Sequence, residues 1–299
     1  MSKMVETKYI LGPMRLPFLI LTPACVALGF GAALWTQGYV APFQLIMVLV
    51  GAVSAHISVN AFNEYFDFKS GLDFQTQRTP FSGGSGTLPA NPHMVKYALV
   101  IAIATFTIVV GIGIYFLMVR GPALLATGIP GLFLLIFYTP WIAHHPYICL
   151  VAPGLGFGPF MVIGTHVALT GSYTWTAFVA SLIPFFLVSN LLLLNQFPDV
   201  EADRDVGRKH LPIVIGRRAS SLVYVGFLLM AYLTLILGVY NQYLPKASLI
   251  GLATAILAVP VCIGSYRYAE NNKKLIPSMG INVAINILTP VLVSIGLII

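Results

Sequence analysis

Residues 95–119 read VKYALVIAIATFTIVVGIGIYFLMV, and Lys96 is the one charged residue in this stretch. A helix crosses a bilayer with about 20 mostly apolar residues. Lipid offers no hydrogen-bond partners, so an isolated segment must form all its backbone hydrogen bonds within itself, as a helix does. Eight further runs have this character, at residues 16–36, 40–62, 121–138, 148–169, 175–197, 219–240, 244–266 and 279–299. The sequence therefore predicts an all-α polytopic membrane protein with nine transmembrane helices.

The overall composition agrees with this interpretation. Of the 299 residues, 58% are hydrophobic and 8% are charged, and the mean hydropathy is +0.89. Soluble domains carry about 25% charged residues, and disordered chains are more polar still. The three cysteines lie far apart in apolar runs, which excludes a secreted disulfide scaffold.

The basic residues predict the orientation in the membrane. With nine spans and a cytoplasmic N-terminus, 14 of the 16 Lys and Arg residues fall on cytoplasmic segments, and only Arg120 and Lys246 fall outside them. The net charge of +7 is then a topology signal and does not indicate nucleic-acid binding. We expect residues 1–299 to form a single domain, with two weakly repeated halves at about 1–140 and 141–299.

Seven of the nine acidic residues lie in two short clusters. Residues 60–73 read NAFNEYFDFKSGLD, and residues 195–205 read NQFPDVEADRD. Each cluster has an Asn four residues before an Asp, a spacing that puts both side chains on one face of a helix. Because both clusters follow a span at its predicted cytoplasmic end, we expect them to be the two edges of one site.

Two acidic edges around one space repel each other unless a cation lies between them. Mg²⁺ takes oxygen ligands and characteristically joins one or two carboxylates to substrate phosphates. Basic residues flank both clusters, among them Lys69 and Arg78 after the first and Arg208 and Lys209 after the second. This combination favours a Mg²⁺–diphosphate over a bare cation.

The paired motifs resemble those of a known family. Asn63-x3-Asp67 with Asp73, and Asn195-x3-Asp199-x3-Asp203, are similar to the two aspartate-rich motifs of the UbiA superfamily of intramembrane prenyltransferases. The first motif is most like the 1,4-dihydroxy-2-naphthoate branch of the menaquinone pathway. The resemblance extends to residues 77–80, 137–140 and 207–211, which read QRTP, FYTP and GRKHL.

This resemblance implies a fold, a reaction and its partners. The fold would be nine helices around a central cavity with a cytoplasmic cap, in an integral protein of the cell membrane. The reaction would be Mg²⁺-dependent transfer of a prenyl group from an allylic prenyl diphosphate to a lipophilic, aromatic quinone precursor. Two Mg²⁺ ions would bridge the diphosphate, and no nucleic acid is expected as a partner.

The resemblance also implies roles for individual residues. The expected metal ligands are Asn63, Asp67, Asp73, Asn195, Asp199 and Asp203. The expected catalytic residues among them are Asp67, Asp199 and Asp203. The expected substrate-binding residues are Arg15, Asn63, Glu64, Arg78, Tyr138, Asn195 and Lys209. Glu64 stands where many members have Asp, so the carboxylate is kept on a side chain one methylene longer.

Two alternative functions are compatible with parts of this pattern. A terpene cyclase of the same superfamily would ionise the same donor without an acceptor. A secondary transporter would also have many spans and internally repeated halves, but transporters place charges near the membrane midplane. Here nearly all acidic residues lie at one predicted edge, which favours the prenyltransferase.

Overall fold

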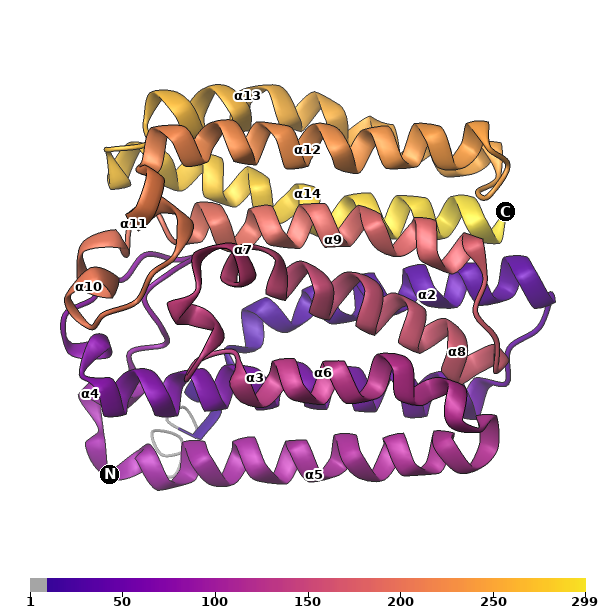
Figure 1. Ribbon diagram of the computed structural model, residues 1–299, viewed down its shortest axis with the longest axis horizontal. Helices are drawn as coiled ribbons and strands as arrows, with labels where there is room; N and C mark the ends of the chain where they lie inside the picture. Colours follow the sequence, from indigo (N-terminus) through magenta and orange to yellow (C-terminus); the bar gives the residue numbers. More distant parts are fainter. Residues whose placement is uncertain (1–9) are drawn as a thin grey trace.

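The computed structural model describes residues 10–299, and this part of the chain is helical with no β-strand. The α-helices are α2 Leu21–Gln37, α3 Pro42–Ser70, α4 Thr87–Ala90, α5 Val95–Arg120, α6 Leu125–Phe137, α7 Pro146–Leu155, α8 Gly164–Thr170, α9 Trp175–Asn195, α10 Val200–Asp205, α11 Leu211–Ile215, α12 Arg217–Tyr240, α13 Ala255–Arg267 and α14 Asn272–Ile298. The 3₁₀ segments are η1 Gly12–Met14, η2 Leu16–Ile20, η3 Leu72–Phe74, η4 Pro92–Met94, η5 Pro122–Leu124, η6 Ile142–His144 and η8 Lys246–Thr254, and η7 Gly156–Ile163 is π-helical. The long helices lie side by side along one axis, and the short helices α4, α10 and α11 gather near one end (Figure 1).

Eight helices of the described residues are long and apolar enough to cross a membrane, which confirms the all-α membrane class. The predicted run at 121–138 corresponds to the shorter apolar helix Pro122–Phe137. Pro122 begins this segment and the chain turns again at Tyr138–Pro140, so its helix is shorter than the other spans. Nine crossings and a cytoplasmic cap therefore stay predictions.

Burial separates an outer layer of helices from an inner one. The most apolar window of α5 is only 11% buried within the protein, whereas that of α9 is 61% buried. In Figure 1, α5 lies at the edge of the bundle and α9 runs through its middle. Large apolar side chains point outward, including Met118 at 75% and Ile256 at 80% exposure. Such surfaces match the lipid expected around a membrane protein and not water.

Glycines let the inner helices approach closely. A Cβ on Gly154 would lie 2.2 Å from the carbonyl oxygen of Phe185, and one on Gly158 would lie 2.5 Å from that of Ser181. Small residues at helix interfaces allow this backbone contact in membrane proteins. The segment from α7 through η7 is therefore pressed directly against α9.

The π-helical segment η7 has an identifiable cause. Pro153 lies in α7, three residues before this segment, and Pro159 lies inside it, and neither can donate a backbone hydrogen bond. Irregular turns of this kind occur frequently at functional sites. Here the segment presents Phe157, Phe160 and Met161 to the internal cavity described below.

Candidate active site

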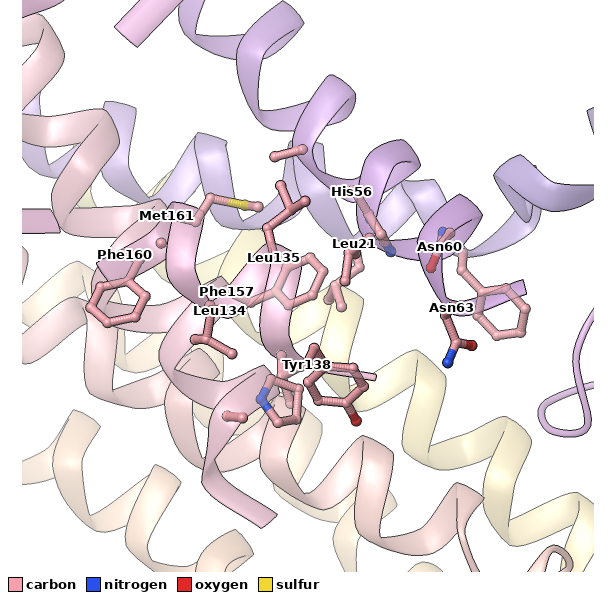
Figure 2. A pocket seen from close by; sticks show the side chains of 18 of the residues that line it. Leu21, His56, Asn60, Asn63, Leu134, Leu135, Tyr138, Phe157, Phe160 and Met161 are labelled. Atoms are coloured by element: carbon pink, nitrogen blue, oxygen red, sulfur yellow. The ribbon is translucent and has the colours of Figure 1, made fainter. Parts of the chain in front are cut away.

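An internal cavity of about 640 Å³ lies between the helices. One end is polar and is lined by charged groups and amides from α3, α9, α10 and the loops beside them. The rest is mostly apolar, and Figure 2 shows Leu134, Leu135, Phe157, Phe160 and Met161 around it. The cavity therefore suits a molecule with a charged head and a long apolar body.

Helix α3 forms one wall along much of the cavity. Val48, His56, Asn63 and Asp67 line it at spacings of whole or nearly whole helical turns. At 1.5 Å per residue, the distance along α3 from Val48 to Asp67 is about 28 Å. The wall changes from apolar at Val48 to acidic at Asp67, so the polarity of the cavity increases along α3 from Val48 towards Asp67.

The two acidic clusters meet at the polar end through Arg208. Its Nη2 donates to Asp67 Oδ1 of the first cluster, and its Nη1 donates to Asp203 Oδ1 of the second at 3.1 Å. Asp203 Oδ2 lies 2.8 Å from His210 Nε2. All four side chains line the cavity. Residues of both acidic clusters therefore lie together at this end of the cavity.

Local backbone structure explains why Arg208, and not Lys209, enters the cavity. Helix α10 ends at Asp205, and Gly207 adopts a φ of +80°, which a glycine accommodates without strain. The chain then folds back, so that the Arg208 N–H donates to the Asp203 carbonyl oxygen at 2.9 Å. Lys209, the predicted diphosphate contact, is exposed and is not a lining residue.

Several oxygens at the polar end have no protein partner. Asp73 Oδ2, Asn195 Oδ1 and Asp199 Oδ1 are buried and accept no hydrogen bond from the described residues. Buried polar atoms left unpaired are costly, and hard oxygen atoms of this kind are the ligands that Mg²⁺ prefers. These three residues therefore fit a divalent cation.

The protein alone does not complete a metal site. Among residues 10–299, no three His, Cys, Asp or Glu side chains converge closely enough to hold an ion by themselves. Mg²⁺ typically takes one or two carboxylates together with substrate phosphates. The arrangement thus fits an ion that arrives with a phosphate-bearing ligand.

Burial also changes the acidity of two of these carboxylates. Burial, followed by the negative charges of Glu64 and Asp67, raises the pKa of Asp73 to about 7. Burial and the charge of Asp203 raise the pKa of Asp199 to about 8. Both groups are outside the membrane-spanning helices. Without a cation nearby, each retains a proton to a higher pH than an ordinary carboxyl.

The remaining predicted residues divide into two groups. Arg15, Asn63 and Tyr138 line the cavity, and Asn63 Nδ2 donates to Thr139 Oγ1 at 3.2 Å. Glu64 and Arg78 do not line it. Arg78 is exposed, and its guanidinium lies against Gly86, where an added Cβ would approach it to 2.0 Å. Their predicted direct contact with substrate therefore has no support from this geometry.

The sequence interpretation missed two residues of the polar end. Arg208 was considered only as a flanking charge, and His210 only as part of the GRKHL match. Gly207, which breaks the helix before them, was the signal that this segment folds back. His56 also lines the cavity, where its Nδ1 lies 2.8 Å from Thr22 Oγ1.

Comparison with known sequences finds one matching family and several similar proteins. The model of the UbiA prenyltransferase family matches residues 21–283. A 1,4-dihydroxy-2-naphthoate octaprenyltransferase from Mycobacterium tuberculosis is 27% identical over 89% of this chain and 87% of its own. The enzyme of the same description from Bacillus subtilis is also 27% identical, over 63% of this chain and 60% of its own length.

Solved structures show the same fold at low sequence identity. A UbiA homologue from Aeropyrum pernix matches with a TM-score of 0.71 at 17% identity, covering 94% of this chain and 97% of its own. A UbiA homologue from Archaeoglobus fulgidus, bound to GPP and Mg²⁺, matches with a TM-score of 0.64 at 12% identity, covering 96% and 99%.

Proposed function

The chain belongs to the UbiA prenyltransferase family, and on that premise we propose that it prenylates a lipophilic aromatic quinone precursor from an allylic prenyl diphosphate. Both naphthoate prenyltransferases described above support this acceptor class. The observation that carries the proposal is the meeting of two acidic clusters around Arg208 at the polar end of an apolar cavity.

In this proposal the polar end holds the donor diphosphate. Asp67, Asp73, Asp199 and Asp203, with Asn63 and Asn195, would hold two Mg²⁺ ions on it. The Archaeoglobus homologue bound to GPP and Mg²⁺ supports the use of this metal. When bound, the ions would neutralise the leaving diphosphate as the allylic C–O bond breaks.

The protein's own cations would act on the same group. Arg15 and Arg208 both line the cavity, and each can donate several hydrogen bonds to phosphate oxygens. Arg208 is held between Asp67 and Asp203, so with the diphosphate bound at this end it would lie beside the developing negative charge. Preorganised donors at such a place stabilise the transition state strongly.

The apolar part of the cavity would hold the prenyl chain and the acceptor. Its walls exclude water, which would otherwise capture the allylic cation. His56 lies eleven residues before Asp67, about 16 Å deeper along α3. Because Thr22 engages its Nδ1, Nε2 is the ring nitrogen free to meet a polar group of the acceptor.

We also propose that the polar end faces the cytoplasm. Fourteen of the 16 basic residues fall on the segments predicted to be cytoplasmic. A Lys209→Cys variant places a thiol at an exposed position of this end. Impermeant maleimide should label it in inverted vesicles and not in intact cells; the reverse would contradict the orientation.

The acceptor is tested by product analysis. Purified protein in nanodiscs would receive Mg²⁺, geranylgeranyl or longer donors, and either 1,4-dihydroxy-2-naphthoate or 4-hydroxybenzoate. We expect a product that joins the prenyl chain to the naphthalene ring of the acceptor, with either a proton or the carboxylate, as CO2, lost from the substituted carbon. Prenylated hydroxybenzoate alone would reassign the acceptor, a hydrocarbon product would indicate a cyclase, and no consumption of any donor would contradict the enzyme.

A further inference from the structure

Glu64 lies in the first acidic motif, but its contacts differ from those of its neighbours. Its side chain is fully buried and does not line the cavity. Oε1 accepts hydrogen bonds from Arg15 Nε and from the Ser85 backbone N–H, each at 2.7 Å. Oε2 accepts from Ser85 Oγ at 2.7 Å. Both oxygens are therefore used by the protein itself.

These bonds tie two separate segments to α3 beside the polar end. One is the 3₁₀ pair η1 and η2, which Arg15 joins, and the other is the glycine-rich loop 82–86. Arg15, Ser82 and Gly84 all line the cavity, so both segments form part of its wall. Glu64 thus holds these two segments of the wall in place from the side that faces away from the cavity.

Close packing shows how tightly the loop is placed. Gly84 has a φ of +71°, and a Cβ there would lie 3.1 Å from Asp73 Oδ1 and 3.3 Å from Glu64 Oε1. The loop backbone therefore passes directly beside the Asp73 carboxylate, whose other oxygen, Oδ2, is buried without a partner among the described residues. A small displacement of this loop changes the surroundings of Asp73.

Arg15, which donates to Glu64, has an uncommon backbone conformation. Its φ and ψ of 51° and 52° are left-handed, which is uncommon for a residue other than glycine. Such conformations persist where surrounding contacts enforce them, and they concentrate at functional sites. With Nε bound to Glu64, the two Nη groups of Arg15 are left for other partners.

We propose that Glu64 is a positioning residue, which sets Arg15 and the glycine-rich loop around the diphosphate site and does not itself bind metal or substrate. This inference rests on the proposed function for the identity of the ligand. The length of the side chain matters, because an Asp carboxylate would stand about 1.5 Å further back. An Asp at this position would lose contact with Ser85, with Arg15 or with both.

Hydrogen exchange of the ligand-free protein tests the positioning directly. The variants are Glu64→Asp and Glu64→Gln, and the control is Glu201→Gln, which changes an exposed carboxylate of the second cluster. We expect amide exchange in residues 82–87 to accelerate about tenfold or more in both Glu64 variants, since a hydrogen bond to a charged acceptor is lost. The control should exchange like the wild type, and unchanged exchange in the Glu64 variants would overturn the proposal.

A milder variant keeps the test interpretable if Glu64→Gln does not fold. Ser85→Ala removes the bond to Oε2 and leaves the buried pair of Glu64 with Arg15 intact. We expect locally faster exchange in the same loop, with no change in the exchange of α9. Acceleration spread over the whole protein would indicate a merely structural role and would overturn the proposal.

Kinetics separate positioning from direct ligation. We expect Glu64→Asp to raise the KM for the prenyl donor about tenfold, with a smaller change in kcat and none in the acceptor KM. Loss of kcat and of Mg²⁺ dependence with unchanged loop exchange would make Glu64 a direct ligand. If the wild type turned over no donor, the proposed function would fail, and the exchange experiment would still decide whether Glu64 positions the loop.

Discussion

Replacing Arg208 by Met tests the bridge between the two acidic clusters. The Arg208 side chain is 16% exposed and pairs with Asp67 and Asp203, which are 7% and 6% exposed. Met keeps most of the side-chain volume but removes the charge and all donors. The ligand-free protein then has two carboxylates without their countercharge, and the donor diphosphate loses one preorganised cation.

The expected loss can be estimated from comparable sites. Removing one preorganised hydrogen-bond donor from a developing negative charge costs about 3–4 kcal/mol, a factor of roughly 10²–10³. Breaking a buried ion pair also destabilises a fold by about 3–5 kcal/mol. Protonation of the unpaired carboxylates would reduce this loss, because it removes their charge. We therefore expect kcat/KM for the donor to fall about 10²-fold or more, with a lower melting temperature.

The assay is continuous diphosphate release from nanodisc-embedded protein, at saturating acceptor and Mg²⁺. Arg204→Met is the matched control, because Arg204 belongs to the same cluster but is 53% exposed and pairs only with exposed Glu201. Lys209→Ala tests the residue that the sequence favoured. Both should stay within about threefold of the wild type, as expected for exposed charges. An Arg208→Met enzyme within threefold of the wild type, or an equal loss in Arg204→Met, would refute the reasoning.

Because burial raises the pKa of Asp73 to about 7 and of Asp199 to about 8, their protonated forms stabilise the ligand-free fold, and this contribution is lost as the pH rises through those values. The affinity for Mg²⁺ with donor should therefore increase from about pH 6 to 8, by up to tenfold per pH unit for each proton displaced. Calorimetry in two buffers should detect the proton release, and an affinity that does not change with pH would contradict this prediction. Gly158→Ala should lower the free energy of unfolding by about 1–3 kcal/mol, because the added Cβ would meet a carbonyl oxygen of α9. Gly156→Ala is the control, since the space around Gly156 is open. Equal melting temperatures of the two variants would contradict this packing. His56→Phe should raise the acceptor KM more than the donor KM in steady-state kinetics, and a selective effect on the donor would place the acceptor elsewhere.

Much of the fold could be predicted because it depends on composition over long windows. Each of the nine apolar runs corresponds to a helical segment, since about 20 apolar residues without charge have few alternatives in lipid. Residues 121–138 were the exception in length, because prolines at both ends shorten that helix. The π-helical η7 could not be predicted from hydropathy, which does not distinguish a π turn from an α turn.

The site was predictable in its acidic residues and less so in their partners. Asp67 follows Asn63 by one helical turn along α3, as the spacing predicts. The same spacing in the second cluster does not lie on one helix, because α9 ends at Asn195 and α10 begins at Val200. Asp67 and Asp203 nevertheless both line the cavity. Arg208 reaches the same place through a turn at Gly207, and helical periodicity says nothing about a side chain beyond a helix end. The contact of Glu64 with Ser85 joins residues 21 positions apart across a loop, which no local pattern encodes.

Diphosphate release and acceptor prenylation, measured together, show whether one site made of both clusters couples the two. Wild-type protein in nanodiscs would receive donor, Mg²⁺ and 1,4-dihydroxy-2-naphthoate, beside Asp67→Asn and Asp199→Asn variants that each alter one cluster. We predict one diphosphate released per prenylated acceptor, no release without Mg²⁺, and near-complete loss of activity in either variant. Equal release without acceptor, or full activity in one of the two variants, would contradict this prediction.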